Sequence, residues 1–430
     1  MIRVCQLAWP TRTVLLAATE ALLVAAAWLL AAGLAGSDIA ISAAWLARLA
    51  GAGAACALCL YYFDLYEPLM LRQPRAMAPR VLQTLGAASL LLALVYLEWP
   101  PLAIAIEIFL PGILLAGLLL MLFRGLFAAC NLSAAWAQPA VLVGSGPLAD
   151  AVAAELRRRP ELGLRLVELG ASGQRIRRVI AAGSEAALPA LRWLRAAGVR
   201  IETADSFYEA LTGRVPLETL GGGERAPDCF PRPARCLCIY KRAFAAAAAG
   251  AGLLLAAPLM LAVAAAIRLD SPGPALFRQA RVGYRGQLFL LYKFRSMHAR
   301  ADTSGLEPPA IPGDRRFTRL GAWLRRTRLD ELPQLWNILR GDMDLVGPRP
   351  FVPSQERALA QAIPGYSLRW EARPGMTGWA QVRRGYCASE ADNRDKLGYD
   401  LFYLKHMSAA LDWLILFETA KTVLLGRGSR

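Results

Sequence analysis

Two adjacent carboxylates, Asp330 and Glu331, lie in a short window that is rich in arginine. The window reads Arg-Arg-Thr-Arg-Leu-Asp-Glu-Leu-Pro over residues 325–333, and the stretch Gly-Asp-Met-Asp-Leu-Val-Gly-Pro-Arg-Pro follows at 341–350. One carboxylate can attack phosphorus while its neighbour holds a divalent cation, and guanidinium groups can neutralise the phosphate oxygens that repel an anionic nucleophile. The residue types and their spacing therefore indicate chemistry on phosphates.

The same dyad also has a purely structural interpretation. Asp is a favoured helix N-cap, and acidic residues in a first helical turn complement the helix dipole. Pro333 and the residues after it predict a helix that starts at this point. That helix end, with arginines at 325, 326 and 328, would also keep Asp330 ionised and attract phosphate. The local sequence leaves both interpretations open.

The composition predicts a membrane protein. Hydrophobic residues make up 56% of the 430-residue chain, which exceeds what soluble domains carry. The formal net charge of +16 fits an anionic membrane face and anionic substrates. Nucleic acid would fit the charge as well, but the sequence shows no helix-turn-helix pattern, zinc-finger spacing or RNP-like strand. We therefore expect no nucleic-acid partner.

Four apolar segments near residues 13–35, 43–65, 81–98 and 102–123 are long enough to cross a bilayer. The turns after the first and third segments lack Lys and Arg, whereas the segment after the second contains Arg72, Arg75 and Arg80. The positive-inside rule then places both ends of this module in the cytoplasm. We expect a four-transmembrane-helix bundle over residues 1–130.

Residues 138–212 are expected to form a small Rossmann-like α/β domain. A β-like run at 140–143 is followed by Gly144-Ser-Gly146, and glycines at such a turn let backbone N–H groups approach a pyrophosphate. Pro147 removes one of those donors, and no clear acidic ribose ligand follows. Nucleotide binding and a structural or regulatory role both stay open for this domain. Residues 213–240, rich in glycine and proline, are predicted to be a linker.

A fifth apolar stretch occupies residues 241–269. Pro258 interrupts it, and basic residues flank both of its ends. A spanning helix would put the basic C-terminal part outside the cell, against the positive-inside rule. We therefore predict a re-entrant membrane helix that breaks near Pro258 and returns to the same face.

Further cations lie on turns stiffened by proline. Ser-Pro-Gly-Pro-Ala-Leu-Phe-Arg-Gln-Ala-Arg-Val-Gly occupies 271–283, Lys-Phe-Arg-Ser-Met occupies 293–297, and Gly-Pro-Arg-Pro occupies 347–350. With these motifs the chain from Lys241 onward resembles the bacterial sugar transferase family, the polyprenyl-phosphate hexose-1-phosphate transferases. The N-terminal helices and the middle domain resemble those of its larger members, the undecaprenyl-phosphate galactose or glucose phosphotransferases. The resemblance implies a mixed α/β catalytic domain with interfacial helices over residues 270–430.

The resemblance also implies roles for individual residues. Asp330 is the expected nucleophile, and Glu331 is the expected second catalytic residue and ligand of a Mg²⁺ cofactor. Four cations are expected to bind substrate, through phosphate contacts or as the lining of the nucleotide-sugar or lipid-phosphate pocket: Lys293, Arg295, Arg325 and Arg349. Where relatives often have Ser after Gly-Asp-Met, this chain has Asp344.

The expected reaction moves a hexose-1-phosphate from a UDP-sugar to polyprenyl (undecaprenyl) phosphate through a phospho-aspartyl intermediate, releasing UMP. It would initiate exopolysaccharide or O-antigen synthesis at the bacterial inner membrane, with membrane lipids around the helices and the catalytic domain in the cytoplasm. Glucose and galactose are the expected hexoses, and the helical bundle could serve a homodimer. The alternative is a membrane glycosyltransferase that releases UDP and binds its metal through Asp342 and Asp344 as a DxD motif.

Overall fold

The computed structural model describes residues 2–4, 6–9, 11–36, 42–67, 70, 74–131, 137–167, 176–182, 198–220, 230, 233–298, 316–384 and 390–425. The chain divides into two compact units: residues 1–4 with 8–207, and residues 5–7 with 208–430. The first contains the predicted membrane bundle and the small α/β domain. The second contains the fifth apolar helix and the Asp330–Glu331 dyad.

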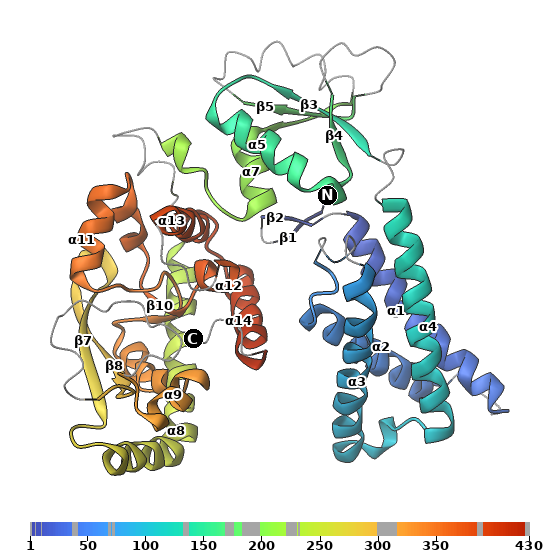
Figure 1. The fold of residues 1–430 in the computed structure, drawn as a ribbon, viewed down its shortest axis with the longest axis horizontal. Coiled ribbons are helices and arrows are strands. Elements are labelled where there is room, and N and C mark those ends of the chain that lie inside the picture. The colour runs from blue at the N-terminus through green and yellow to red at the C-terminus, as the bar shows by residue number, and fades with distance from the viewer. Residues whose placement is uncertain are drawn as a thin grey trace. The chain divides into compact units, whose positions relative to one another are not determined.

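The four predicted spans are confirmed as helices that are long and apolar enough to cross a membrane (Figure 1). They are α1 (Thr11–Leu34), α2 (Ala43–Tyr62), α3 (Pro74–Glu98) and α4 (Ile106–Asn131), with the short 3-10 turn η2 (Pro100–Leu102) before α4. The helix α3 begins before the predicted span because its first two turns carry Arg75, Pro79 and Arg80, which a hydropathy window excludes. Small and aromatic residues such as Ala27, Trp28 and Ala116 are buried between the helices.

Among the buried groups of the bundle is an ion pair. Arg124 Nε lies 2.6 Å from Glu20 Oε1, and both side chains are fully buried. Arg124 Nη2 donates to Glu20 Oε2 at 2.9 Å, and Nη1 donates to the Leu65 carbonyl oxygen at 2.8 Å. Charges inside an apolar bundle are tolerated when they are paired in this way. The pair therefore links α1 to α4 and to the end of α2.

The α/β region of the first unit holds a four-stranded parallel sheet in the order β4-β3-β5-β6. Its strands are β3 (Gln138–Val143), β4 (Leu164–Leu166), β5 (Arg178–Ala181) and β6 (Arg200–Thr203). The helices and turns around them are α5 (Pro147–Arg158), η4 (Pro160–Leu162) and the start of α7 (Ala204–Thr212). The strands β1 (Ile2–Val4) and β2 (Leu7–Trp9) form a separate pair that the sequence did not predict.

The glycine turn after β3 has a structural requirement of its own. Gly144 has φ +106°, and a Cβ at this position would lie 1.5 Å from the Ala182 carbonyl oxygen. Only glycine fits such a conformation at such a distance. Close packing against the end of β5 thus accounts for Gly144, and nucleotide binding at this turn stays a prediction.

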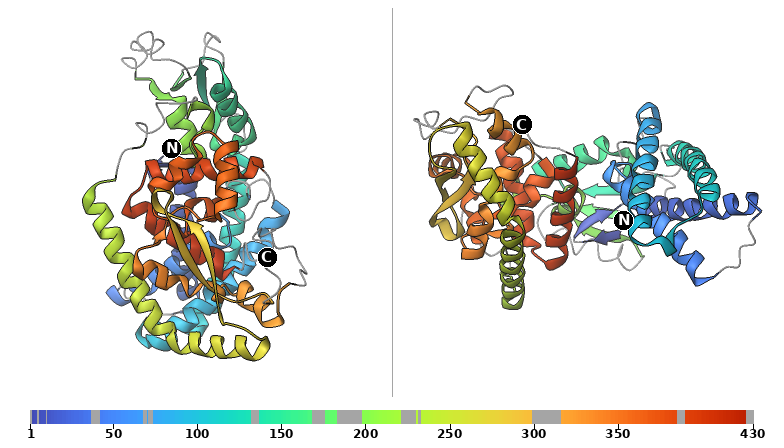
Figure 2. Two further views of the ribbon diagram at one scale, coloured as in Figure 1. Left: turned by 90° about the vertical axis from the view of Figure 1, so that its left-hand side faces the viewer. Right: turned by 90° about the horizontal axis from the view of Figure 1, so that it is seen from below.

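The fifth apolar helix, α8 (Arg235–Asp270), begins inside the segment that was predicted to be a linker. Figure 2 shows that its two halves run in clearly different directions. Pro258 lies within the helix. Proline removes one helical hydrogen bond and clashes with the preceding turn, so it is the physical cause of such a bend.

Both halves of α8 pack on the same domain. In the first half, Ala245 and Ala249 contact a cluster that includes Leu291, Ile338 and Met343. In the second half, Val263 and Ile267 contact a cluster that includes Phe294 and Leu324. Three leucines between these contacts are largely exposed: Leu254, Leu255 and Leu261. The middle of α8 is thus apolar and uncovered, while both ends are held by one domain.

That domain is mostly helical, with two small sheets. The strands β7 (Leu276–Val282) and β8 (Leu288–Phe294) form an antiparallel hairpin around η9 (Tyr284–Gly286), and β9 (Asp344–Val346) pairs in parallel with β10 (Gly375–Thr377). The helices are α9 (Arg319–Arg326), η10 (Leu329–Glu331), α10 (Gln334–Arg340), α11 (Pro353–Ala362), η11 (Tyr366–Glu371), α12 (Trp379–Arg384), α13 (Glu390–Lys405) and α14 (Ala409–Leu424).

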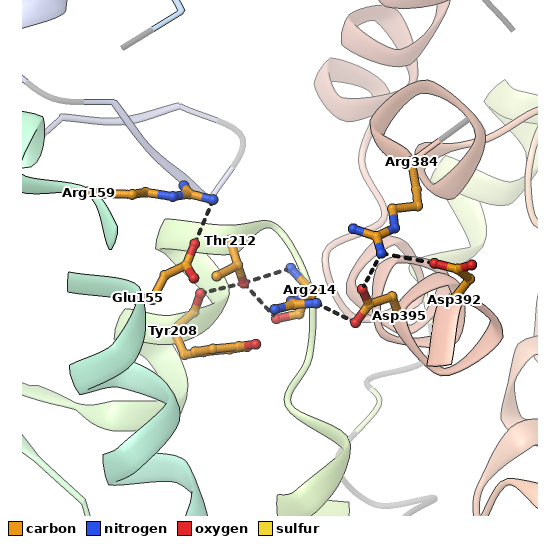
Figure 3. Close-up of polar contacts among 8 residues, drawn as sticks. All are labelled: Glu155, Arg159, Tyr208, Thr212, Arg214, Arg384, Asp392 and Asp395. Atoms are coloured by element: carbon orange, nitrogen blue, oxygen red, sulfur yellow. Dashed lines mark hydrogen bonds and ion pairs between the residues drawn. The ribbon is translucent and has the colours of Figure 1, made fainter. Parts of the chain in front are cut away.

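The segment from residue 208 to η7 (Leu217–Leu220) contacts α12 and α13 in the same unit. Trp379 Nε1 donates to the Gly213 carbonyl oxygen at 2.7 Å, and the Val215 N–H donates to the Gly398 carbonyl oxygen at 2.9 Å. Arg214 forms an ion pair with Asp395, which also pairs with Arg384 (Figure 3). The first residues of the predicted linker therefore have fixed partners.

Candidate active site

The dyad lies in the short turn η10, just before α10. Asp330 is 7% exposed and Glu331 is 8% exposed. Neither caps a helix, because the N-cap residue of α10 is Pro333 and no side chain donates or accepts at that cap. Arg328 precedes the turn with a left-handed backbone, φ +57°. The capping interpretation is therefore wrong, and the burial of two adjacent carboxylates requires another reason.

Three cations surround Glu331. Lys293 Nζ lies 3.4 Å from Oε1, Arg349 Nη2 lies 3.5 Å from Oε1, and Arg328 Nη1 lies 3.7 Å from Oε2. They come from β8, from the turn after β9 and from the residue before η10. Burial alone would raise the pKa of Glu331, but these cations lower it to about 2. Glu331 is therefore ionised throughout the physiological pH range.

The pKa of Asp330 is shifted in the opposite direction. Burial raises the pKa of this carboxyl above its ordinary value, and the nearby charge of Glu331 acts in the same direction. Lys293, Arg325 and Arg349 oppose the shift without reversing it. Among the described residues, no cation forms a salt bridge with Asp330. The pair thus combines one carboxylate that is held by cations with one that keeps more of its basicity.

Lys293 lowers the pKa of both carboxylates. It lies near the end of β8, opposite Phe277 of β7, and its side chain is 20% exposed. Burial lowers the pKa of Lys293, and Glu331 partly offsets this effect. The strand β8 therefore presents an ammonium group to the dyad.

The other predicted substrate cations are placed in different ways. Arg349 lies at the dyad, as described above. The Arg325 guanidinium carbon lies 4.6 Å above the ring of Phe317, from where it acts on Asp330 only at longer range. Arg295 points elsewhere: it donates to the carbonyl oxygens of Ser271, Ile267 and Pro272 at 2.6, 3.2 and 3.0 Å. Because the last carbonyls of a helix lack intrahelical partners, Arg295 satisfies the C-terminus of α8.

Asn337 is a site residue that the sequence analysis missed. It is fully buried, its Oδ1 accepts from the Tyr292 N–H at 3.0 Å, and its Nδ2 donates to the Leu290 carbonyl oxygen at 2.7 Å. The amide thereby ties α10 to the free edge of β8, the strand that bears Lys293. The available signal was a polar residue set directly between the apolar Trp336 and Ile338, since a polar residue that becomes buried must find partners.

The two aspartates of the DxD alternative have different partners. Asp342 lies 3.6 Å from Arg340 Nε and accepts from Asn337. Asp344 is buried on β9, and its Oδ1 lies 3.9 Å from Arg242 Nη1. The two aspartates of this motif thus contact different cations.

The dyad itself fits Mg²⁺ of the kind that arrives with a phosphate substrate. Such ions take one or two protein carboxylates and fill their remaining positions with phosphate oxygens and water. The cations around Glu331 lie 3.4 to 3.7 Å from its oxygens, longer than a tight charge-assisted hydrogen bond. The Glu331 carboxyl group is therefore ionised, and none of these three cations forms a short hydrogen bond with it.

Two hollows lie in the second unit. One, of about 200 Å³, is lined by Pro348, Arg349, Trp370 and their neighbours. The other, of about 330 Å³, lies between α8, β9 and α14. Neither dyad residue lines either hollow, and the first shares Arg349 with the surroundings of Glu331.

The chain is similar to several known proteins. Residues 237–426 match the model of the family described as bacterial sugar transferase. A UDP-N-acetylgalactosamine-undecaprenyl-phosphate N-acetylgalactosaminephosphotransferase of Aeromonas hydrophila is 43% identical over 222 residues, 52% of this chain and 52% of that protein. A UDP-glucose:undecaprenyl-phosphate glucose-1-phosphate transferase of Caulobacter vibrioides is 43% identical over 45% of this chain and 73% of that protein.

For a third relative, the match to this chain covers almost the whole protein. The exopolysaccharide production protein PSS of Rhizobium leguminosarum bv. phaseoli is 42% identical over 44% of this chain, and the match takes in 98% of that protein. The coverage of the relatives thus varies, and the chain spans about half the length of the Aeromonas protein. The family model, these identities and the buried dyad lead to one conclusion: the chain belongs to the bacterial sugar transferase family.

Proposed function

We propose that the protein transfers a hexose-1-phosphate from a UDP-sugar to undecaprenyl phosphate and releases UMP. The observation that carries the proposal is the buried pair Asp330 and Glu331, with their unlike pKa shifts, beside Lys293 and Arg349. The printed names of the Aeromonas and Caulobacter relatives support the reaction class. They differ in the sugar, so a glucose, galactose or N-acetylgalactosamine donor fits equally.

In the first step an Asp330 carboxylate oxygen attacks the β-phosphorus of the UDP-sugar. A P–O bond forms between Asp330 and the β-phosphorus, the bond from the β-phosphorus to the bridging oxygen breaks, and UMP leaves with that oxygen. In the second step a phosphate oxygen of undecaprenyl phosphate attacks the same phosphorus, and Asp330 leaves. The product is undecaprenyl diphospho-sugar, and the enzyme returns to its starting state.

The neighbouring charges fit these steps. A basic carboxylate is the better nucleophile, and Asp330 is the less strongly stabilised of the two. Lys293 and Arg349 would neutralise the phosphate oxygens as charge builds up on them. Glu331 would hold Mg²⁺ at the diphosphate, where the ion would act as a Lewis acid. In this proposal Arg325 provides longer-range charge and Arg295 fixes the end of α8.

We further propose that α8 is re-entrant. A straight helix of 36 residues would be about 54 Å long, well beyond the roughly 30 Å of a bilayer core. Yet Lys241 at one end donates to Asp412 of α14 at 2.7 Å, and Ser271 at the other end accepts from Arg295 after β8. One domain cannot hold both ends if they lie on opposite sides of a membrane. A helix that enters and returns brings a cytoplasmic site to the depth of the lipid phosphate.

The membrane setting completes the proposal. Five apolar helices support a membrane protein, and we place it in the bacterial inner membrane with the dyad on the cytoplasmic side, where nucleotide sugars are made. Its product would begin an exopolysaccharide or O-antigen chain. The membrane bundle is proposed to support a homodimer, and no nucleic-acid partner is proposed.

Product analysis tests the reaction class. Purified protein is incubated with UDP-glucose or UDP-N-acetylgalactosamine, undecaprenyl phosphate and Mg²⁺, and UMP and UDP are separated. We expect UMP, and a loss of roughly 10⁴-fold or more in Asp330→Asn, the scale seen when an essential nucleophile is removed. Asp344→Ser, which introduces the residue that relatives often have, should keep its UMP release. Release of UDP, together with inactivity of Asp344→Ser, would instead establish the DxD glycosyltransferase.

A further inference from the structure

We infer that Arg369 is a positioning residue for the proposed reaction and acts through the backbone of Arg349. Arg369 lies in η11 and is 4% exposed. Its Nη2 donates to the Arg349 carbonyl oxygen at 2.8 Å, and Arg349 in turn places its own Nη2 3.5 Å from Glu331 Oε1. The buried guanidinium of Arg369 is thus connected to the dyad through a single residue, Arg349. The inference rests on the proposed function, because it assigns Arg349 a part in that reaction.

The Arg369 guanidinium has a fixed orientation. Its Nη1 donates to Glu356 of α11 at 2.9 Å and to the Tyr366 hydroxyl at 2.8 Å. Its Nε donates to Asp400 of α13 at 3.1 Å. Arg369 also lies over the ring of Phe351 at 5.0 Å, just beyond the Arg349 turn. Because guanidinium donors form a rigid planar fork, these partners also determine where the N–H that reaches Arg349 points.

The Arg349 turn needs such a donor. Pro348 and Pro350 flank Arg349, and proline has no N–H to donate, so the backbone on both sides of Arg349 lacks a donor. The backbone is held from outside the turn through its carbonyl oxygens: the Gly375 N–H donates to Pro348 at 3.0 Å, and Arg281 Nη1 donates to Pro350 at 3.4 Å. The carbonyl oxygen of Arg349 itself accepts from Arg369, so Arg369 is the side chain that fixes the backbone at Arg349.

Lysine cannot replace Arg369 in this arrangement. A lysine at this position would keep the positive charge between Glu356 and Asp400, but its single ammonium group cannot reach both carboxylates, Tyr366 and the Arg349 carbonyl in one plane. Arg349 would then lose its fixed direction toward Glu331. Displacement of a catalytic group by about 1 Å can cost on the order of 100-fold in rate. The inference thus predicts a defect from a substitution that preserves the charge of a residue acting through Arg349.

A double-mutant cycle tests the inference. UMP release from the active UDP-sugar is measured for wild type, Arg369→Lys, Arg349→Ala and the double variant, with kcat and KM determined for each. We expect Arg369→Lys to lose roughly 10- to 100-fold in kcat/KM, split between kcat and KM as in Arg349→Ala. The double variant should be no slower than Arg349→Ala alone, because Arg369 then has nothing left to position. Arg214→Lys, a change of the same type at a residue that pairs with Asp395, should leave kcat/KM unchanged.

Other outcomes overturn the inference in distinguishable ways. Multiplying effects in the double variant would show that Arg369 acts independently of Arg349. A fall in apparent kcat alone, with KM unchanged and a lower melting temperature, would show a loss of folded enzyme and so a merely structural role. Full activity of Arg349→Ala would remove both residues from the reaction while the Asp330 chemistry stands. Wild-type protein that releases no UMP would instead contradict the proposed function itself.

Discussion

At the scale of single residues, the site shifts the pKa values of two neighbouring carboxylates in opposite directions. Glu331 faces Lys293, Arg328 and Arg349 and has a pKa of about 2, whereas burial raises the pKa of Asp330. The difference between the two pKa shifts depends on which carboxylate the cations reach, not on whether the residue is Asp or Glu. A held anion beside a basic one is the arrangement that a metal ligand and a nucleophile require.

The pH dependence follows from these shifts. In the proposed reaction Asp330 must be ionised, so kcat/KM should fall as the pH is lowered through its raised pKa. Lys293 lowers the pKa of Asp330. In Lys293→Met this opposing charge is absent, so the acid limb of the kcat/KM profile should move to higher pH, and the rate at neutral pH should drop by on the order of 100-fold. A limb that stays in place or moves to lower pH would contradict the assignment.

At the scale of elements, the proposed re-entrant path rests on the bend in α8 and on the contacts that hold its two ends. Lys241 with Asp412 and Tyr403 holds the second turn, and Arg295 holds the last one. The contacts at both ends come from one domain, while the leucines between them are exposed. The middle of the helix thus has the apolar surface of a membrane segment, while its ends pack on the domain that holds the dyad.

Cysteine accessibility tests the re-entrant path. In a background without other cysteines, Cys238 and Leu269→Cys are exposed positions near the two ends of α8. A membrane-impermeant maleimide should label both in inverted membrane vesicles and neither in intact spheroplasts. Trp99→Cys, in the turn between α3 and α4, is the control and should show the opposite pattern. Labelling of positions 238 and 269 from opposite faces would establish an ordinary spanning helix.

At the scale of the whole molecule, the proposed chemistry belongs to the second unit alone. The family model covers residues 237–426, and a match over 44% of this chain takes in 98% of the Rhizobium relative. The membrane bundle and the α/β sheet of the first unit contain none of the proposed site residues.

The sequence predicted features that repeat along the chain or lie within one motif. Hydropathy located the four spans of the first unit, and the motif at 325–333 identified the dyad. Side-chain direction could not be read in this way: Arg295 and Lys293 are two residues apart, yet one satisfies the end of α8 and the other faces Glu331. Arg369 lies 20 residues from the carbonyl that it holds, and Asn337 lies 45 residues from Tyr292. Contacts across such separations depend on the fold.

The most direct measurement is mass spectrometry of the protein quenched in acid after brief mixing with its UDP-sugar and Mg²⁺, without undecaprenyl phosphate. The account predicts a hexose-phosphate adduct on the peptide that contains Asp330, formed together with one equivalent of UMP, and lost when undecaprenyl phosphate is added before the quench. The adduct should be absent from Asp330→Asn. Full turnover with no adduct, or an adduct on a different residue, would contradict the claim that Asp330 attacks phosphorus.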